Sequence, residues 1–312
     1  MAKFIIKRVA YGLITMFIII TATFFLIHAV PGDPMAQGAK HFPEAARAAF
    51  KEKDGLDKPL YVQYFVYLKG LLRGDLGDSI EHTGRSVNSI VKSHAPVSGI
   101  IGGRALIIEL VVGVLFGIIA AFNRERLPDH VIMFFVILLI CMPTFVSCSI
   151  LQYIFGVKLR WVPVVGWGKL KNAILPVIAM ALGGIATYTK FTRNSILNVI
   201  SQDYIITAKA KGLSTGRLTR KHVLRNAMIP IVTLIGPAIL GIFNGSFIIE
   251  SIFAIPGLGQ YFVEAVNTKD YSVMMGLTIF TSCLYVLSLI LVDILYAIVD
   301  PRIRIAESDQ SR

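Results

Sequence analysis

The sequence predicts an all-α protein that crosses a membrane six times. Of its 312 residues, 55% are hydrophobic and only 16% are charged, and the mean hydropathy is +0.68. Several apolar runs are long enough to cross the roughly 30 Å hydrocarbon layer, which takes about 20 helical residues. Because lipid offers the backbone no hydrogen-bond partners, these runs are expected to be helices. The six expected spans are 9–30, 98–122, 131–155, 173–191, 229–252 and 273–299.

The first span helps to divide the chain into regions. It follows the bases Lys3, Lys7 and Arg8. Its apolar run is too long for the core of a signal peptide, which is about 7–15 residues. We therefore expect an uncleaved first span with a cytoplasmic N-terminus. The expected regions are a tail with the first span (1–30), an extracytoplasmic loop (31–97), a membrane core (98–300) and a cytoplasmic C-terminal tail (301–312).

Two loops bear on the orientation of the chain. Acidic and basic residues nearly balance in 31–97, which fits a translocated loop, and its amphipathic stretch around Tyr61, Tyr64 and Phe65 predicts a helix at the membrane interface. The basic loop 158–171 runs against the positive-inside rule. The more basic segment 190–225 outweighs it, so we expect that segment and both termini in the cytoplasm.

Polar residues inside the expected spans are candidates for function. Arg104 and Glu109 lie in the second span, and intramembrane charges are functional candidates by default. Because five residues separate them, the two side chains do not share a helical face. Arg104 is close enough to the outer end of the span for its charged group to reach the membrane surface. For Glu109, structural pairing or packing and a role in a transport pathway both stay open. Asn244 and Gly245, in the glycine-rich fifth span, are candidates for the same two roles.

The third span and the cysteines have simpler interpretations. The third span contains Pro143, and neighbouring helices can satisfy the backbone groups that a proline frees. Cys141, Cys148 and Cys283 lie in apolar runs without the spacing of metal ligands. They are expected to be small buried hydrophobic residues.

The segment 201–228 is the most polar stretch between two spans in the second half. Ser201 is a plausible N-cap for a short helix with the acid Asp203 in its first turn. Gly212 offers the left-handed conformation that ends a helix, and Ser214 can cap a second helix. The bases of this segment are Lys209, Lys211, Arg217, Arg220, Lys221 and Arg225.

Two interpretations of this segment are open from its residues. As a solvated cytoplasmic loop, its bases would only fix the topology. Alternatively, small Ala208 and Ala210 beside Gly212 would let another backbone approach closely, and the turn would present the short helix to a groove on a partner protein.

The segment resembles the coupling loop, or EAA loop, of inner-membrane permeases of ATP-binding-cassette (ABC) importers. In particular it is similar to the peptide-importer variant, the oligopeptide and dipeptide permease family, of the first-permease type. The matching residues are Asp203, Tyr204, Thr207, Ala208, Lys209, Ala210, Lys211, Gly212 and Leu213, followed by His222, Leu224, Arg225, Asn226, Ala227 and Pro230.

Further matches to this family cover nearly the whole chain. They include the PGDP sequence after the first span (31–34) and the loop sequence 55–79. Others lie in an expected re-entrant or short helical piece, 251–271, and at the closing sequence from Asp293 to Arg302. The matches around that piece are Glu250, Phe253, Pro256, Gly257, Leu258, Gly259, Ala265, Lys269, Asp270 and Tyr271.

The resemblance implies a type I ABC importer fold with a cytoplasmic coupling helix, in the inner membrane of a bacterium. It implies half of a translocation pathway for oligopeptides or dipeptides, in contact with membrane lipid. The implied partners are a second, similar permease, two ABC ATPase subunits and an extracytoplasmic peptide-binding protein or lipoprotein. In the coupling helix, Gly212 would give the turn, Ala208 and Ala210 the close approach, and Lys209 and Lys211 the charge contacts.

Other chemistry is not indicated by the sequence. It has no P-loop motif, so ATP and Mg²⁺ are expected on partner chains and no cofactor on this one. We expect no metal site, catalytic residue or nucleic-acid partner, since histidines are scattered and the bases sit between spans. Nickel or a metallophore, glutathione or haem stay open as cargo. An alternative of another class is an ion-coupled secondary transporter or channel.

Overall fold

The computed structural model describes residues 2–29, 58–82, 84–244 and 247–299. These residues form helices joined by turns, with one isolated β-bridge between Asp78 and Ser86, which confirms the all-α prediction. The helices are α1 (Ala2–Ala29), α3 (Leu60–Leu72), α4 (Val87–Phe122), α5 (Leu127–Cys141), α6 (Thr144–Leu151), η2 (Gln152–Lys158), α7 (Leu170–Ile200), α8 (Asp203–Ala210), α9 (Thr215–Leu218), η3 (Thr219–Leu224), α10 (Arg225–Ala227), α11 (Ile229–Thr233), α12 (Ile235–Asn244), α13 (Phe247–Phe253), α14 (Leu258–Thr268) and α15 (Tyr271–Val299).

Four helices are each long and apolar enough to cross a membrane: α1, α4, α7 and α15. A fifth candidate is the bent pair formed by α5 and the segment Thr144–Lys158. The run 229–252 is divided among α11, α12 and α13, and none of these short helices qualifies alone. The described residues therefore support an integral membrane protein with four or five spans by this criterion, and the number six stays a prediction.

The third expected span, 131–155, is not straight. Its two halves meet at an angle of 108°. Pro143 is the N-cap of α6, and Met142 before it has extended backbone angles (φ −82°, ψ 121°). A proline has no N–H to donate and disfavours the helical conformation of the residue before it. The α-helix therefore breaks at this proline.

Two helices extend well beyond their expected spans. α4 begins at Val87 rather than residue 98, behind Ser86, whose hydroxyl accepts a hydrogen bond from the backbone N–H of Ser89 at 3.2 Å. α7 continues to Ile200 rather than ending near residue 191. Hydropathy locates only the apolar part of a helix, and polar residues prolong both helices past it.

α4 packs extensively against α7. Gly113 and Gly117 of α4 lie directly on the backbone of α7: a Cβ atom at residue 117 would come within 2.8 Å of the Thr189 carbonyl oxygen. Small residues permit such contact, which supplies van der Waals packing where lipid removes the hydrophobic driving force. These two glycines therefore set the distance between α4 and α7.

Replacing Gly117 with alanine is expected to lower the free energy of unfolding by about 1–3 kcal/mol, the usual effect of overpacking. Gly103, on the same helix, is the matched control, because a Cβ atom at this position would meet nothing within 4 Å. Gly103→Ala is expected to be neutral or slightly stabilising, since glycine weakens a helix interior. Thermal unfolding of the purified complex measures both, and equal melting temperatures would contradict the packing role.

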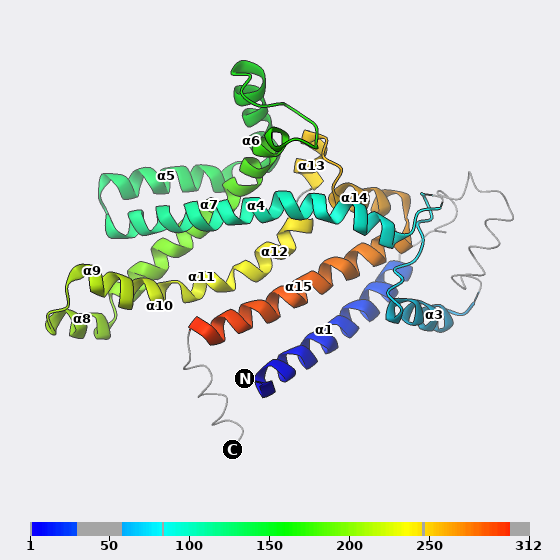
Figure 1. The fold of residues 1–312 in the computed structure, drawn as a ribbon, viewed down its shortest axis with the longest axis horizontal. Helices are drawn as coiled ribbons and strands as arrows, with labels where there is room; N and C mark the ends of the chain where they lie inside the picture. The colour runs from blue at the N-terminus through cyan, green and yellow to red at the C-terminus, as the bar shows by residue number, and fades with distance from the viewer. Residues whose placement is uncertain (1, 30–57, 83, 245–246, 300–312) are drawn as a thin grey trace.

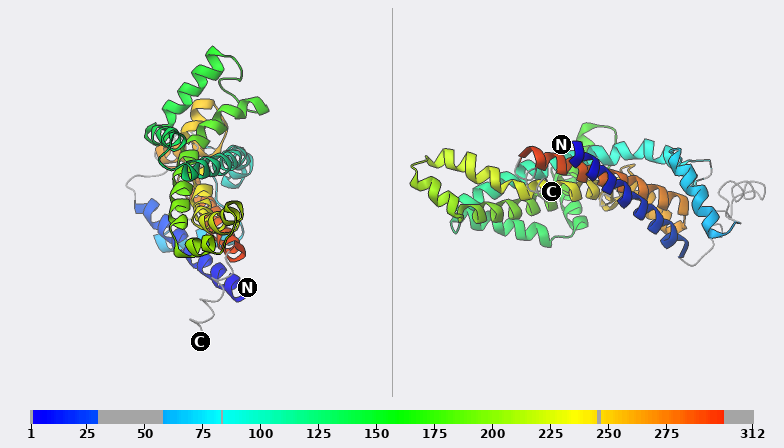
Figure 2. Two further views of the ribbon diagram at one scale, coloured as in Figure 1. Left: turned by 90° about the vertical axis from the view of Figure 1, so that its left-hand side faces the viewer. Right: turned by 90° about the horizontal axis from the view of Figure 1, so that it is seen from below.

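The remaining long helices lie side by side along the molecule (Figure 1). α1 runs along α15, and Arg8 of α1 makes an ion pair with Asp293 of α15 at 3.3 Å. α3 is the helix predicted at the membrane interface; its Tyr64 stacks on Phe25, and the Tyr64 and Thr21 hydroxyls are 2.6 Å apart. α3 and the α8–α9 hairpin lie at opposite ends of the molecule (Figure 2).

Two buried carboxylates fasten the segments near α14. Asp270 accepts hydrogen bonds from the backbone N–H groups of Ile80 and Val273, so it joins the loop before α4 to the start of α15. Glu250 of α13 accepts from the Ser98 hydroxyl at 2.7 Å and from the Gly259 N–H at 2.9 Å. The piece expected as re-entrant or short and helical is thus the short helix α14, held against α4.

The cysteines are not uniformly buried, which corrects the expectation. Cys148 is buried, Cys283 is half-buried, and Cys141 is exposed on α5. An apolar residue on a membrane-spanning segment does not have to be buried within its own chain, because lipid or another subunit can cover it. Apolar neighbours in the sequence therefore do not predict burial here.

Candidate coupling site

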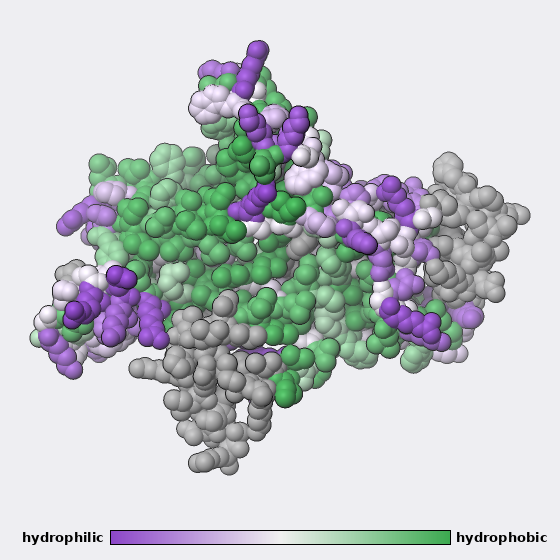
Figure 3. Space-filling model, viewed as in Figure 1, coloured by the Kyte–Doolittle hydropathy of each residue, from purple (hydrophilic) through white to green (hydrophobic). Residues whose placement is uncertain are grey.

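The candidate coupling site is a helical hairpin at one end of the molecule, made of α8, α9 and η3. Hydrophilic side chains gather there and at the opposite end, and a hydrophobic surface lies between them (Figure 3). The hairpin follows directly on the long helix α7.

The entry into α8 corrects one expectation. Ser201 is not its N-cap: it is the C-cap of α7, and its hydroxyl donates to the Asn198 carbonyl at 2.9 Å. Gln202 occupies the N-cap position of α8, without a side-chain capping bond. Asp203 lies in the first turn of α8, as predicted. Ser201 is engaged by α7 because that helix continues as far as Ile200.

The end of α8 is the left-handed turn that the sequence predicts. Gly212 has φ +77°. Its N–H donates to the Lys209 carbonyl at 2.9 Å, and the Leu213 N–H reaches the Ala208 carbonyl at 3.4 Å. These two bonds form a Schellman motif, which satisfies carbonyls left unpaired at a helix end. Because residues that carry a side chain rarely adopt a positive φ, the turn depends on glycine.

One face of α8 packs on the spans. Ile205 is 1% exposed and Ala208 is 8% exposed. Both lie in a cluster with Ala121 of α4, Ile196 of α7, Leu218, Val223 and Ala227. The close approach that Ala208 makes is therefore to this chain's own helices, whereas we expected it to serve a partner.

The other face of α8 is exposed. It carries Lys209, Ala210 and Lys211, which the sequence singles out, together with Tyr204 at 43% and Ile206 at 60% exposure. Ile206 was missed by the sequence reasoning. The signal was the pair Ile205–Ile206, because adjacent residues of a helix do not share a face and only one of them can point inward.

Polar contacts tie the two arms of the hairpin together. The Asn226 side-chain amide donates to the Tyr204 hydroxyl at 3.1 Å and to the His222 carbonyl at 2.9 Å. Thr207 bonds within α8, from its hydroxyl to the Asp203 carbonyl at 3.0 Å. Tyr204 and Asn226, which lie 22 residues apart in the matched motif, are thus in direct contact.

The second arm is less regular than predicted. It begins after Ser214, whose carbonyl accepts from the Leu218 N–H at 2.9 Å, and then changes from α9 to the π-helix η3 and to α10. Arg217, Arg220 and Lys221 line an open hollow beside Gly216. The basic character expected of this arm is therefore concentrated on its surface.

A buried ion pair joins the neighbouring spans just beyond the hairpin. Arg193 of α7 donates two hydrogen bonds of 2.7 Å to the two carboxylate oxygens of Asp129 at the start of α5. Asp129 is 2% exposed and also accepts from the Glu125 N–H at 3.0 Å. The sequence reasoning missed this pair, because the 64 residues between the partners leave no local pattern.

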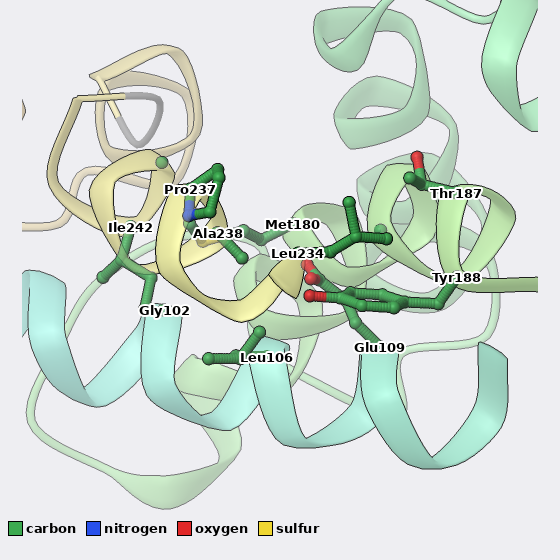
Figure 4. Close-up of a pocket in the computed structure, with 12 residues that line it drawn as sticks. Gly102, Leu106, Glu109, Met180, Thr187, Tyr188, Leu234, Pro237, Ala238 and Ile242 are labelled. Carbon is green, nitrogen blue, oxygen red and sulfur yellow. The ribbon is translucent and has the colours of Figure 1, made fainter. Parts of the chain in front are cut away.

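The other candidate residues lie away from the hairpin. Arg104 is exposed on α4, and Glu109 is half-buried in a cavity between α4, α7 and α12 (Figure 4). In the described part of the chain, no ion pair joins these two residues. Asn244 ends α12, and Gly245 lies outside the described residues. The structure thus brings together the nine coupling candidates and leaves Arg104, Glu109 and Asn244 apart from them.

The fold and the hairpin define a helical membrane protein with a compact polar element fixed to one end of its spans. A family model for the binding-protein-dependent transport system inner membrane component matches residues 113–305, and a model for the N-terminal part of such membrane components matches 1–102. The chain belongs to this family of transport system inner membrane components. The alternative class of secondary transporter or channel is not supported.

Relatives of full length agree with this assignment. The oligopeptide transport system permease protein OppB of Haemophilus influenzae is 42% identical over 97% of this chain and 100% of its own. The dipeptide transport system permease protein DppB of Bacillus subtilis is 40% identical over 98% and 99%. OppB of Escherichia coli is 39% identical over 97% and 100%. A solved MetNI methionine ABC transporter in inward-facing conformations overlaps 66% of this chain and 92% of its own with a TM-score of 0.48 at 15% identity, which is too low to add to the assignment.

Proposed function

We propose that this chain is the permease subunit of an ABC importer and forms half of a pathway for oligopeptides or dipeptides. The observation that carries the proposal is similarity along almost the whole chain to permeases named for these cargoes, at 39–42% identity. The position of the matched coupling motif in a protruding hairpin supports it further. The chain itself catalyses nothing in this proposal.

The proposed partners follow from the same relationship. A second, similar permease completes the pathway, an extracytoplasmic binding protein delivers the cargo, and two ATPase subunits hold ATP and Mg²⁺ without any cofactor on this chain. The hairpin and both termini then face the cytoplasm. One contact fits this arrangement: the ion pair between Arg8 and Asp293 joins the N-terminal part of α1 to the C-terminal part of α15.

In the proposed mechanism the ATPases move the hairpin when they bind ATP and close. A displacement of α8 reaches α4 and α7 through the buried cluster around Ile205 and Ala208. The contacts of α8 must differ between ATPase states, because only a difference in interaction energy can shift an equilibrium between inward-facing and outward-facing forms.

The cargo is tested by isolating the complex with its binding protein from cells and identifying the bound ligand by mass spectrometry. Peptides of two or more residues are expected. Nickel or a metallophore, glutathione or haem as the bound ligand would overturn the cargo while leaving the importer class intact.

Ile206 is expected to be an ATPase contact. Replacing it with glutamate should weaken retention of the ATPase subunits at least about tenfold, or about 1.4 kcal/mol, because an exposed apolar anchor becomes a charge inside the interface. Folding should be unaffected, since the side chain is 60% exposed. Leu72→Glu is the matched control, because Leu72 is 90% exposed at the opposite end. Equal retention by both variants in a titrated pull-down would exclude Ile206 from the interface.

A further inference from the structure

A cavity of about 390 Å³ lies between α4, α7 and α12, inside the membrane-spanning length of the chain. Glu109, at its base, is 13 residues before the end of α4, or about 20 Å along the helix axis. Most of the lining is apolar. Its polar side chains are Glu109, Thr187 and Tyr188 (Figure 4).

The Tyr188 hydroxyl has no hydrogen-bond partner among the described residues, although the side chain is 2% exposed. It points toward the Glu109 carboxyl group (Figure 4). The Thr187 hydroxyl, by contrast, donates to the Gly183 carbonyl at 3.0 Å. Leaving a buried polar group unpaired is unfavourable, so such a group calls for an explanation.

Glu109 is likewise without a hydrogen bond or ion pair in the part of the chain that the structure describes. It differs in this from the buried carboxylates Asp129, Glu250 and Asp270, each of which accepts hydrogen bonds from this chain. Its carboxyl group lies against Gly184, where any side chain would occupy the same space. The cavity therefore holds one carboxyl and one hydroxyl that the protein itself does not use.

We propose that Glu109 and Tyr188 bind the amino-terminal ammonium group of a peptide as it passes through the membrane. An ammonium group has three N–H donors and needs acceptors. The Glu109 carboxylate and the Tyr188 oxygen supply them, and the ring of Tyr188 offers a face that attracts cations. The inference rests on the proposed function, because it takes the transported molecule to be a peptide with a free amino terminus.

Protection of Glu109 from chemical modification tests the site without requiring transport. The complex is treated with dicyclohexylcarbodiimide, which adds to carboxyl groups in apolar surroundings, and the adducts on Glu109 and Glu250 are quantified by mass spectrometry. Trialanine at about ten times its dissociation constant is expected to slow modification of Glu109 about tenfold by mass action. N-acetyltrialanine, which has no ammonium group, is expected to give no protection, and reactivity of Glu250 should not depend on either peptide.

Two variants separate the proposed role from a structural one. Tyr188→Phe is expected to weaken peptide binding about tenfold, the usual effect of losing a hydrogen bond to a charged group. At the same trialanine concentration, modification of Glu109 should then be slowed only about twofold. Thr187→Val is the matched control on the same cavity wall, because its hydroxyl is already engaged by Gly183. An equal effect of the two variants would overturn the role of Tyr188.

Several other outcomes of the protection experiment would overturn the proposal. Equal protection by trialanine and its acetylated form overturns recognition of the ammonium group, and so does protection by neither. Protection by acetylated alanyl-lysyl-alanine but not by trialanine shifts the assignment to a lysine side chain and overturns the amino terminus. Failure of Glu109 to react in the free complex overturns the site, since the cavity would not admit a molecule of this size. Peptide uptake, measured in parallel, tests the proposed function separately. If peptides are taken up but do not protect Glu109, the proposed binding site is wrong and the proposed function stands.

Discussion

Replacing Gly212 with leucine is expected to lower ATP-driven uptake roughly 5- to 30-fold while the chain still inserts into the membrane. The turn at the end of α8 has φ +77°, and a side chain in the left-handed region costs about 1–2 kcal/mol. Without the turn, the exposed face of α8 and the basic arm lose their relative orientation. Uptake by reconstituted vesicles, normalised to the amount of assembled complex, measures the effect.

Gly216→Leu is the control for the glycine turn. Gly216 lies four residues further along the same hairpin, its φ is not positive, and a Cβ atom there meets nothing within 4 Å. The same substitution at this position is expected to retain most of the uptake. Normal uptake by the Gly212 variant would contradict a coupling role for the turn.

Breaking the Asp129–Arg193 ion pair is expected to be the most destabilising single change described for this chain. Asp129→Leu leaves the Arg193 guanidinium, which donates two hydrogen bonds of 2.7 Å to Asp129, without its partner. Removal of one member of a fully buried pair costs about 3–5 kcal/mol, because the other charge stays buried and uncompensated. The Arg193 side chain is 20% exposed, so water can partly solvate it and the loss is expected toward the lower end of this range. The thermal stability of the purified complex measures the loss.

The double variant Asp129→Leu with Arg193→Met distinguishes the pair from simple packing. Replacing a buried ion pair by apolar residues of similar size is often nearly neutral, since both desolvation penalties disappear together. The double variant should therefore be more stable than Asp129→Leu alone. If the two losses simply add, the charges do not act as a pair and the link between α5 and α7 lies elsewhere.

Local signals in the sequence predicted the parts of the fold that depend on a few neighbouring residues. The place of Asp203 in the first turn of α8 and the left-handed Gly212 depend on backbone preferences within one turn, and both were predicted correctly. The helix α3 was predicted from an amphipathic pattern, and its position at the membrane interface stays a prediction. Pro143 is a local signal too, and the structure shows that the chain bends there by 108°.

Features that depend on contacts between distant segments could not be read from the sequence. Ser201 is a good capping residue, and only the length of α7 decides that it ends one helix rather than beginning the next. The small size of Ala208 is equally compatible with packing inward or outward, and the cluster with Ala121 and Ile196 decides it. Asp129 finds Arg193 across 64 residues. In each case tertiary structure selects among choices that are equivalent locally.

The continuous helix α7 connects the coupling hairpin to the Glu109 cavity. This helix has 31 residues and is therefore about 46 Å long. Ile196 near one end touches the hairpin, and Gly184 and Tyr188, closer to the middle, form a wall of the cavity. If α7 moved as one body, both regions would be displaced together. In the proposed mechanism, each movement of the hairpin would therefore be accompanied by a change in the shape of the Glu109 cavity.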